Sequence, residues 1–308
     1  MKKKDKIYIA GHQGLVGSAI IRQLKKRGFS NIITKKRLEV DLLNQEQVKH
    51  FFEEHKPDYV FLAAGKTGGV YANNTYRAEF IYENLVVQTN VIHQSFLSEV
   101  RKLVFFGCSS MYPQITPQPM KEEFLFSGHL EPTNEPFAVA KLAGVKMCES
   151  YNRQYGTDFI SVIPTNIYGI NQNYDPMNSL VVPALIRKFH EARHTNAKEV
   201  VIWGSGRPSR DFLFADDLAD AVSFLMETYS DNDILNVGTG RDYTIGELAE
   251  IVKEVVSYEG KIIYDVSKPD GVLVKLQNIT RMSELGWKHK VELKEGINRV
   301  YDEFKTIK

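Results

Sequence analysis

A strand–turn–helix unit near the start of the chain most limits what this sequence can fold into. It runs from Lys6 to Leu24 and spaces three glycines as Gly11-x-x-Gly14-x-x-Gly17. We expect Gly11 to take the positive φ of the turn, Gly14 to let the backbone approach a pyrophosphate, and Gly17 to let the helix lie against the strand. An ordinary strand-to-helix turn is the alternative. The buried strand before it and a helix over Ser18–Lys26 after it favour a dinucleotide-binding turn.

Strands alternate with helices over the first half of the chain. The segments Tyr59–Ala64 and Lys102–Phe106 are apolar without alternation, which is typical of central parallel strands covered on both faces. This order predicts an α/β fold with a Rossmann-like, doubly wound parallel sheet. We expect residues 1–165 to form the nucleotide-binding domain, with a return to it around 211–237. Residues 166–210 and 238–308 would form a smaller, mixed substrate domain.

The composition excludes several classes of protein. The 308 residues include 43% hydrophobic and 25% charged residues and carry a formal net charge of +1, which gives no reason to expect a nucleic-acid or membrane partner. Two cysteines, Cys108 and Cys148, cannot make a disulfide framework and are consistent with a reducing compartment. With no apolar signal segment or spanning helix, we expect a cytoplasmic protein.

A basic triplet follows the second predicted strand. Sites for NAD usually place an acidic residue about twenty positions after the glycines, whereas this chain has Lys35-Lys36-Arg37. Basic groups suit a ribose 2′-phosphate, so the triplet favours NADP. A solvated basic loop is the alternative, because runs of charge are common on surfaces.

Polar residues gather where predicted strands end. Gly65-Lys66 and Cys108-Ser109-Ser110 each follow a buried strand, and ligands bind beyond the carboxyl ends of parallel strands. Phe137 and Lys141 are four residues apart on the next predicted helix and therefore share a face.

Longer motifs resemble a known family. GHQGLVG, DLLN at 41–44, ANNTY at 72–76, EPTNEP at 131–136, CESYNRQYG at 148–156, PTNIYG at 164–169 and VIWGSG at 201–206 closely resemble GDP-L-fucose synthase, an extended short-chain dehydrogenase/reductase. The resemblance covers nearly the whole chain. It implies a homodimer that uses NADPH to epimerise and then reduce a GDP-4-keto-6-deoxy-mannose. The dimer seam would involve helices over 78–98 and 141–155.

The resemblance also shows departures at the catalytic positions. Lys141 is kept, but Phe137 stands at the position of the family tyrosine that donates a proton to the C4 oxygen, and Cys108 stands at that of the serine. Phenylalanine cannot donate a proton, and loss of a general acid typically costs about 10²–10⁴ in rate. Two explanations remain open: a deliberate replacement of a natural tyrosine, or another donor, such as Cys108, a serine hydroxyl or a water held by Lys141.

The epimerase positions depart as well. Ser110 and Leu180 stand where the family has a cysteine and a histidine, and leucine has no ionisable group. This pattern resembles the C4-reductases of capsular heptose pathways, which act after a separate epimerase. We therefore expect reduction without epimerisation.

The binding residues are expected as follows. We assign to the cofactor Gly11, His12, Gly14, Leu15, Val16, Gly17, Lys36, Arg37, Asp41, Leu42, Ala63, Ala64, Gly65, Lys141, Pro164, Asn166 and Ile167. We assign to the GDP-sugar Ser110, Asn166, Leu180, Lys188, Trp203, Arg210 and Asp270, with Trp203 facing guanine and Arg210 the diphosphate.

Several alternatives accompany these assignments. Trp203 could be a core residue, and Arg210 could pair with Asp211. His190 and His194 are four apart on a helix and could bind a metal ion together. Because no third metal ligand is evident in the sequence, we interpret them as part of a solvated helix face.

Three functional hypotheses follow. The first is an NADPH-dependent reductase of a GDP-linked 4-keto sugar. The second is a catalytically silent GDP-sugar-binding homologue or partner subunit. The third, a 4-dehydrogenase with tightly held NAD, is disfavoured by the basic triplet.

Overall fold

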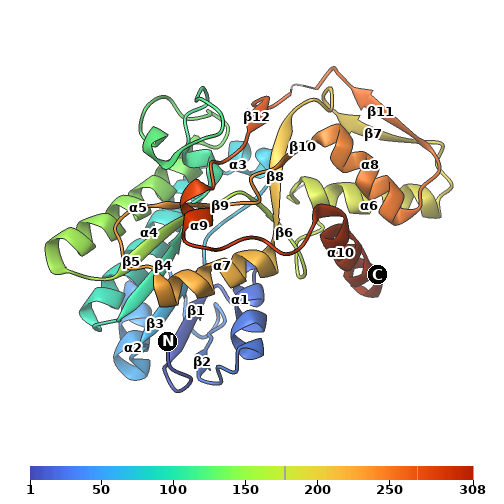
Figure 1. Cartoon of the computed structure of the whole chain (residues 1–308). Helices are drawn as coiled ribbons and strands as arrows, with labels where there is room; N and C mark the ends of the chain where they lie inside the picture. Colours follow the sequence, from blue (N-terminus) through green and yellow to red (C-terminus); the bar gives the residue numbers. More distant parts are fainter. Residues whose placement is uncertain (177, 269, 308) are drawn as a thin grey trace.

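A parallel sheet organises the larger part of the molecule (Figure 1). The computed structural model describes residues 1–176, 178–268 and 270–307. The six strands are β1 (Ile7–Ala10), β2 (Ile32–Ile33), β3 (Tyr59–Leu62), β4 (Lys102–Phe106), β5 (Phe159–Pro164) and β9 (Leu235–Val237). Their order is β2-β1-β3-β4-β5-β9, and every neighbouring pair is parallel. The chain reverses its direction across the sheet at β1, where open α/β sheets bind ligands. The predicted α/β, Rossmann-like fold is confirmed.

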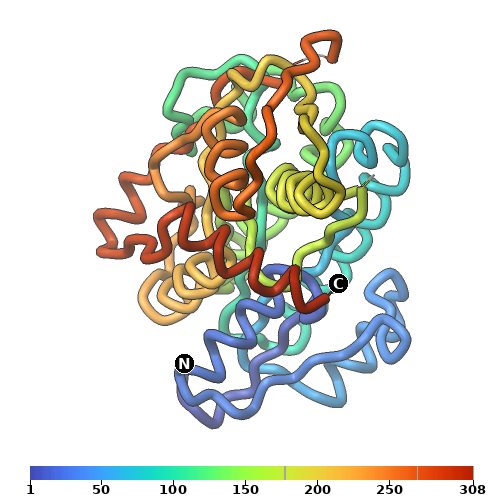
Figure 2. Tube along the Cα trace, turned by 90° about the vertical axis from the view of Figure 1, so that its right-hand side faces the viewer, coloured from blue at the N-terminus to red at the C-terminus, as the bar shows by residue number. Residues whose placement is uncertain are grey.

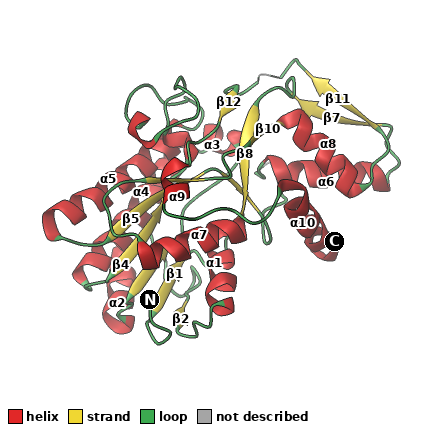
Figure 3. Ribbon diagram, in the orientation of Figure 1, coloured by secondary structure: helices red, strands yellow, loops and turns green. Residues whose placement is uncertain are grey.

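Helices cover both faces of this sheet (Figure 3). Because side chains alternate along a strand, Ile7 and Ile9 of β1 enter one core, and Tyr8 and Ala10 enter the other. The first core lies under α1 (Leu15–Lys26) and α7 (Ala215–Thr228). The second lies under α2 (Gln45–His55), α4 (Arg77–Leu97) and α5 (Glu135–Tyr155). This burial on both faces explains why the strand sequences lack polar alternation.

A third core lies in a smaller region with its own strands and helices. Strand β8 pairs with β6, β10 and β12, and β7 pairs with β11. The elements of this region are β6 (Asn166–Tyr168), α6 (Val181–His194), β7 (Glu199–Trp203), β8 (Ser209–Phe214), β10 (Asp242–Thr244), α8 (Ile245–Val256), β11 (Lys261–Asp265), β12 (Val274–Lys275) and α10 (Leu293–Ile307). The short helices α3 (Val70–Thr75), α9 (Thr280–Glu284), η1 (Ser109–Met111) and η2 (Glu122–Phe124) complete the described elements.

The C-terminal helix lies close to the N-terminal glycine turn (Figure 2). Asn171 joins the two: its N–H donates to Glu303 of α10 at 2.8 Å, and its side chain donates to the Gln13 carbonyl at 2.7 Å.

Most predicted elements occur within a few residues of their expected bounds. Helix α1 begins at Leu15, three residues before the expected Ser18. Strand β8, which includes Asp211, is not apparent from the sequence pattern. Helix α7 then begins at Ala215, with Asp216 and Asp217 in its first turn.

Among the helices in the described part of the chain, none combines the length and apolar character needed to cross a bilayer.

Candidate functional site

The glycine turn after β1 leaves no space for side chains at two of its positions. Gly11 has φ +83°, and a Cβ there would lie 2.7 Å from the Ala64 Cα. A Cβ on Gly17 would overlap the Gly11 carbonyl oxygen, so the close approach of helix and turn requires glycine. A Cβ on Gly14 would meet only that same oxygen at 3.5 Å, an ordinary contact. The roles predicted for Gly11 and Gly17 are confirmed, and Gly14 leaves its backbone open to a ligand.

The first turn of α1 offers donors beside this opening. The N–H groups of Leu15, Val16 and Gly17 have no acceptor within the helix, because the first residues of any helix lack one. Such groups bind phosphate oxygens well. An exposed Gly14 followed by three free N–H groups therefore fits a dinucleotide pyrophosphate.

The basic segment lies next to the same turn. Burial lowers the pKa of His12, the carboxylate of Glu39 raises it, and the charge of Lys36 lowers it further. His12 therefore lies close to Glu39 and Lys36. Arg37 lies 3.6 Å from the Asp41 carboxylate, in an exposed ion pair. Leu42 is half-buried, and its carbonyl accepts a hydrogen bond from Asn90 at 2.9 Å. Lys36 and Arg37 are both exposed, and Lys36 lies close to the glycine turn.

The end of β3 connects the turn to Lys141. Ala63 and Ala64 contact Gly11, and a Cβ on Gly65 would lie 3.6 Å from the Lys141 Nζ. Asn84 fixes this strand end, because its side chain accepts from the Lys66 N–H at 3.1 Å and donates to the Lys66 carbonyl at 3.0 Å.

Lys141 is buried without a hydrogen-bond partner among the described residues. Its side chain extends from α5, only 6% of the residue is exposed, and no carboxylate lies within ion-pair distance. Burial lowers its pKa to about 8, and the thiol of Cys108 opposes that shift when ionised. The Phe105 and Phe137 rings lie 4.9 and 5.9 Å from its Nζ. Perturbed, unpaired groups of this kind concentrate at functional sites.

Cys108 lies directly after β4. Burial raises the pKa of its thiol, whereas Lys141, Lys275 and the backbone N–H groups of Ser110 and Met111 act in the opposite direction. Ser109 and Ser110 follow in η1, half-buried at the same strand end. The structure therefore brings Cys108 and Lys141 together, as the sequence predicts.

Lys275 is a site residue that the sequence reasoning missed. It lies on β12 in register with Arg210 on β8, so both side chains leave the same face of that sheet. Burial and the charge of Arg210 lower the pKa of Lys275, while Cys108 and Glu131 raise it. The two-residue strand that carries it has no periodic pattern, and only its pairing with β8 places Lys275 here.

Arg210 makes contacts other than the alternative pair with Asp211. Its Nη1 donates to the carbonyls of Ser209 and Val272, at 2.7 and 2.8 Å. The Asp211 carboxylate instead accepts from Thr239 and Gly240. The pairing alternative is wrong, and Arg210 and Lys275 form two adjacent cations with no carboxylate in ion-pair distance among the residues that the structure describes.

Asn166 connects these cations to the end of β5. Its side chain donates to the Asp211 carbonyl at 3.1 Å, one residue after Arg210. Buried Pro164 ends β5, and half-buried Ile167 lies beside Asn166 in β6.

A second group of predicted residues lies around Trp203 at the end of β7. Trp203 is 68% exposed, so the core alternative is wrong and its indole is free to stack on a base. The Nζ of Lys188 lies 5.6 Å from the indole ring and donates to the Val201 carbonyl. Asp270 accepts from the N–H and hydroxyl of Ser205, so its carboxylate is already engaged.

Two predicted positions hold groups without acid–base capacity. Leu180, the N-cap of α6, is 46% exposed. Phe137 packs edge-on against Phe80, with ring centroids 6.1 Å apart.

The predicted histidine pair lies on α6. His190 is buried against Tyr301 and Phe304, so the solvated-face interpretation is wrong for it; His194 is exposed. No group of three potential metal ligands occurs within residues 1–176, 178–268 and 270–307.

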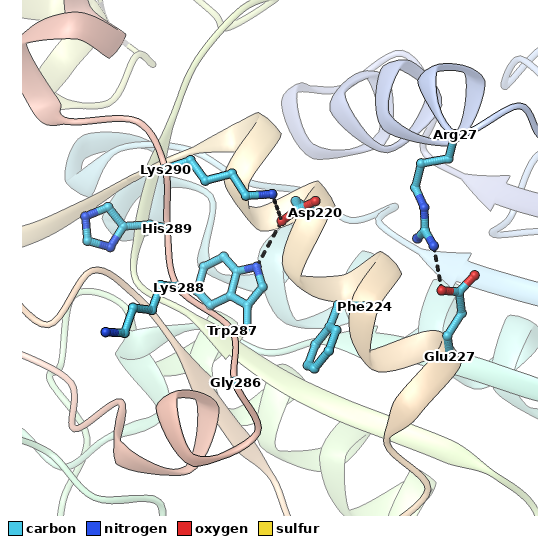
Figure 4. Close-up of a pocket in the computed structure, with 9 residues that line it drawn as sticks. All are labelled: Arg27, Asp220, Phe224, Glu227, Gly286, Trp287, Lys288, His289 and Lys290. Atoms are coloured by element: carbon cyan, nitrogen blue, oxygen red, sulfur yellow. Dashed lines mark hydrogen bonds and ion pairs between the residues drawn. The ribbon is translucent and has the colours of Figure 1, made fainter.

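A surface pocket of about 590 Å³ lies along α7 (Figure 4). Asp220 accepts there from Trp287 and Lys290, and Arg27 pairs with Glu227. Arg27 and Glu227 lie at the ends of α1 and α7 that are remote from the glycine turn, and none of the residues lining the pocket is a predicted site residue.

Comparison with known proteins decides the family. Residues 7–238 match the model of the NAD dependent epimerase/dehydratase family. The chain belongs to this family. Within it, GDP-L-fucose synthase 1 of Arabidopsis thaliana is 52% identical over 300 residues, 97% of this chain and 93% of that protein. The resemblance to GDP-L-fucose synthases is confirmed.

Solved structures of family members also match over the whole chain. A GDP-6-OMe-4-keto-L-xylo-heptose reductase from C. jejuni superimposes with a TM-score of 0.95 at 44% identity, covering 100% of this chain and 99% of that one. A GDP-mannoheptose C4 reductase from Campylobacter jejuni with NADP bound gives 0.92 at 46% identity, with 99% of both chains covered.

Proposed function

We propose that this chain is an NADPH-dependent reductase of the C4 ketone of a GDP-linked 4-keto hexose or heptose, without 3,5-epimerase activity. The observation that carries the proposal is the buried, unpaired Lys141 beside Cys108, at the strand ends that also hold the glycine turn. The bound nicotinamide would supply the hydride. Relatives named as GDP-sugar synthases and C4 reductases, one with NADP bound, support this substrate class and cofactor.

Different residues of the chain bind the cofactor, bind the GDP-sugar and stabilise the charge that develops during the reaction. Gly14 and the first N–H groups of α1 hold the cofactor pyrophosphate, and Lys36 and Arg37 favour a 2′-phosphate. Trp203 stacks on guanine, while Arg210 and Lys275 hold the diphosphate. Lys141 stabilises negative charge that develops on the C4 oxygen.

The absence of epimerase activity rests on Ser110 and Leu180. Removing protons beside the ketone needs an ionisable base, and Leu180 offers none. The direct test follows the reaction with NADPH and a GDP-4-keto sugar in deuterated water. We expect NADPH consumption without deuterium at C3 or C5 of the product. Deuterium at either carbon would contradict the loss of epimerisation.

The main alternative is a catalytically silent GDP-sugar-binding homologue or partner subunit. Phe137 favours it, because its ring lies 5.9 Å from the Lys141 Nζ and bears no hydroxyl. NADPH oxidation by the protein that carries Phe137 would exclude this alternative.

We also propose that the chain forms a homodimer through α4 and α5, which pack together. Tyr82 and Leu97 of α4 and Tyr155 of α5 are more than half exposed. Covering such apolar residues with a second copy would stabilise the pair. Light scattering of the purified chain should give twice the monomer mass, and Tyr82→Glu should shift it toward the monomer; an unchanged mass after substitution would contradict this seam.

A further inference from the structure

The thiol of Cys108 is surrounded by groups that stabilise its anion. Lys141 on α5 and Lys275 on β12 each favour the thiolate by their charge. The Lys141 Nζ lies 4.9 Å from the ring of Phe105, three residues before Cys108 on the same strand end. The backbone N–H of Met111 donates to the Cys108 carbonyl at 3.1 Å, which closes the turn that carries the thiol. Cations from two separate elements thus act on one side chain. That is more than the packing of a small apolar residue requires.

The nearby Lys141 is buried and unpaired. With 94% of the residue removed from solvent and no carboxylate in reach among the described residues, its ammonium has no anion to offset the lost hydration. A buried cation of this kind is stabilised when a negative charge forms next to it. The ionised thiol of Cys108 would supply that charge, because it raises the pKa of Lys141.

We propose that Cys108 is the proton donor of the reduction, in place of the missing tyrosine. The inference rests on the proposed function. When hydride reaches C4, the carbon–oxygen π pair moves onto oxygen, which takes the proton from the Cys108 Sγ. The S–H bond breaks, a thiolate remains between Lys141 and Lys275, and water returns the proton after the product leaves.

The other candidates are less suited to this step. An alkoxide is a far stronger base than a thiolate, so transfer from sulfur is downhill, and burial keeps the thiol protonated near neutral pH by raising its pKa. The hydroxyls of Ser109 and Ser110 are weaker acids than a thiol. Lys141 is the competitor that an experiment must separate, because it carries an acidic proton at the same place.

Kinetics of Cys108→Ala and of the double variant Cys108→Ala/Phe137→Tyr test the assignment. We expect the single variant to lower kcat about 10²-fold or more with little change in KM, and the added tyrosine hydroxyl to restore most of the loss. Cys148→Ala, which removes the buried thiol of α5, is the matched control and should keep the wild-type kcat.

A second measurement needs neither cofactor nor substrate. In the Cys148→Ala background, the rate at which iodoacetamide alkylates Cys108 is followed against pH. Lys141→Met and Lys275→Met should each shift the midpoint to higher pH, because each removes a charge that favours the thiolate. Unshifted midpoints would overturn the arrangement.

The kinetic outcomes separate the inference from the proposed function. A Cys108→Ala variant as active as the wild type, or activity that appears only after Phe137→Tyr, would overturn the role of the thiol while the site remains a reductase site. No NADPH oxidation by either the wild type or Phe137→Tyr with GDP-4-keto hexoses and heptoses would overturn the proposed function itself.

Discussion

Gly17 and Gly14 differ in the room that the backbone leaves for a side chain. A Cβ on Gly17 would overlap the Gly11 carbonyl, whereas one on Gly14 makes only ordinary contact. We expect Gly17→Ala to lower the free energy of unfolding by about 1–3 kcal/mol, because helix and turn must move apart. Gly14→Ala should change it by less than about 1 kcal/mol. Urea unfolding of both variants checks the contrast.

The Gly14→Ala variant also tests the proposed cofactor site. Gly14→Ala places a methyl group where the pyrophosphate would approach, so we expect weaker NADP⁺ binding with nearly unchanged stability. Calorimetric titration measures the affinity. Wild-type affinity in a stably folded Gly14→Ala protein would contradict the placement of the pyrophosphate.

Lys275 and Arg210 are like charges on neighbouring strands. Holding them together in a half-buried place costs free energy unless an anion binds between them. We expect Lys275→Met to weaken GDP binding about tenfold or more, since a hydrogen bond to a charged group contributes about 1.5–3 kcal/mol. Lys261→Met, on exposed β11, is the control. Equal GDP affinity of wild type and Lys275→Met, measured by calorimetry, would remove Lys275 from the diphosphate site.

At the scale of elements, strand β8 joins the two parts of the site. It pairs with β6, which follows directly from the sheet strand β5, and it pairs with β12, which carries Lys275. Its buried Asp211 holds the 238–240 loop, because the carboxylate accepts from the Thr239 N–H and hydroxyl and from the Gly240 N–H.

Asp211 makes stability depend on pH. Burial raises its pKa from 3.8 to about 6, so the folded protein binds this proton more tightly than the unfolded chain does. The contribution of Asp211 to the free energy of unfolding therefore falls as pH rises from about 4 to about 6 and is constant above that interval. Asp211→Asn should remove this slope.

A second variant separates charge from hydrogen bonding at this position. Asp211→Ala leaves the Thr239 and Gly240 donors without an acceptor and should destabilise the protein by about 1–3 kcal/mol for each group that stays buried. Asp211→Asn keeps an acceptor and should lose less. Denaturant unfolding across this pH range measures both, and identical slopes for wild type and Asp211→Asn would contradict the expectation.

At the scale of the whole molecule, a preference for one dinucleotide should appear as a larger increase in Tm when that dinucleotide binds. A ligand that binds only the folded state stabilises it by about 2.7 kcal/mol at one hundred times its Kd. We expect NADP⁺ to raise Tm by several degrees and NAD⁺ at equal concentration by less, because Lys36 lies close to the glycine turn and Arg37 follows it in an exposed segment. Arg37→Ala should reduce the difference, and an equal shift for both dinucleotides would contradict NADP preference.

The sequence predicted those parts of the site that depend on local pattern. The glycine spacing, the apolar runs of β3 and β4, and the four-residue step between Phe137 and Lys141 all reflect the geometry of a single element. Lys275 and β8 could not be found in this way. A two-residue strand has no periodicity, and the polar segment 209–211 is covered because β10 and β12 pair with it while β6 pairs with the residues that follow it.

The sequence by itself determined the α/β architecture and the cofactor turn, because both follow from short-range spacing and residue chemistry. The proposed reacting positions come instead from the resemblance of longer motifs to a family. Only the tertiary structure decided that Trp203 is exposed, that His190 is buried, and that two lysines from distant segments converge on Cys108. Exposure, burial and electrostatic environment are set by which segments pack against one another, and that packing joins residues more than a hundred positions apart.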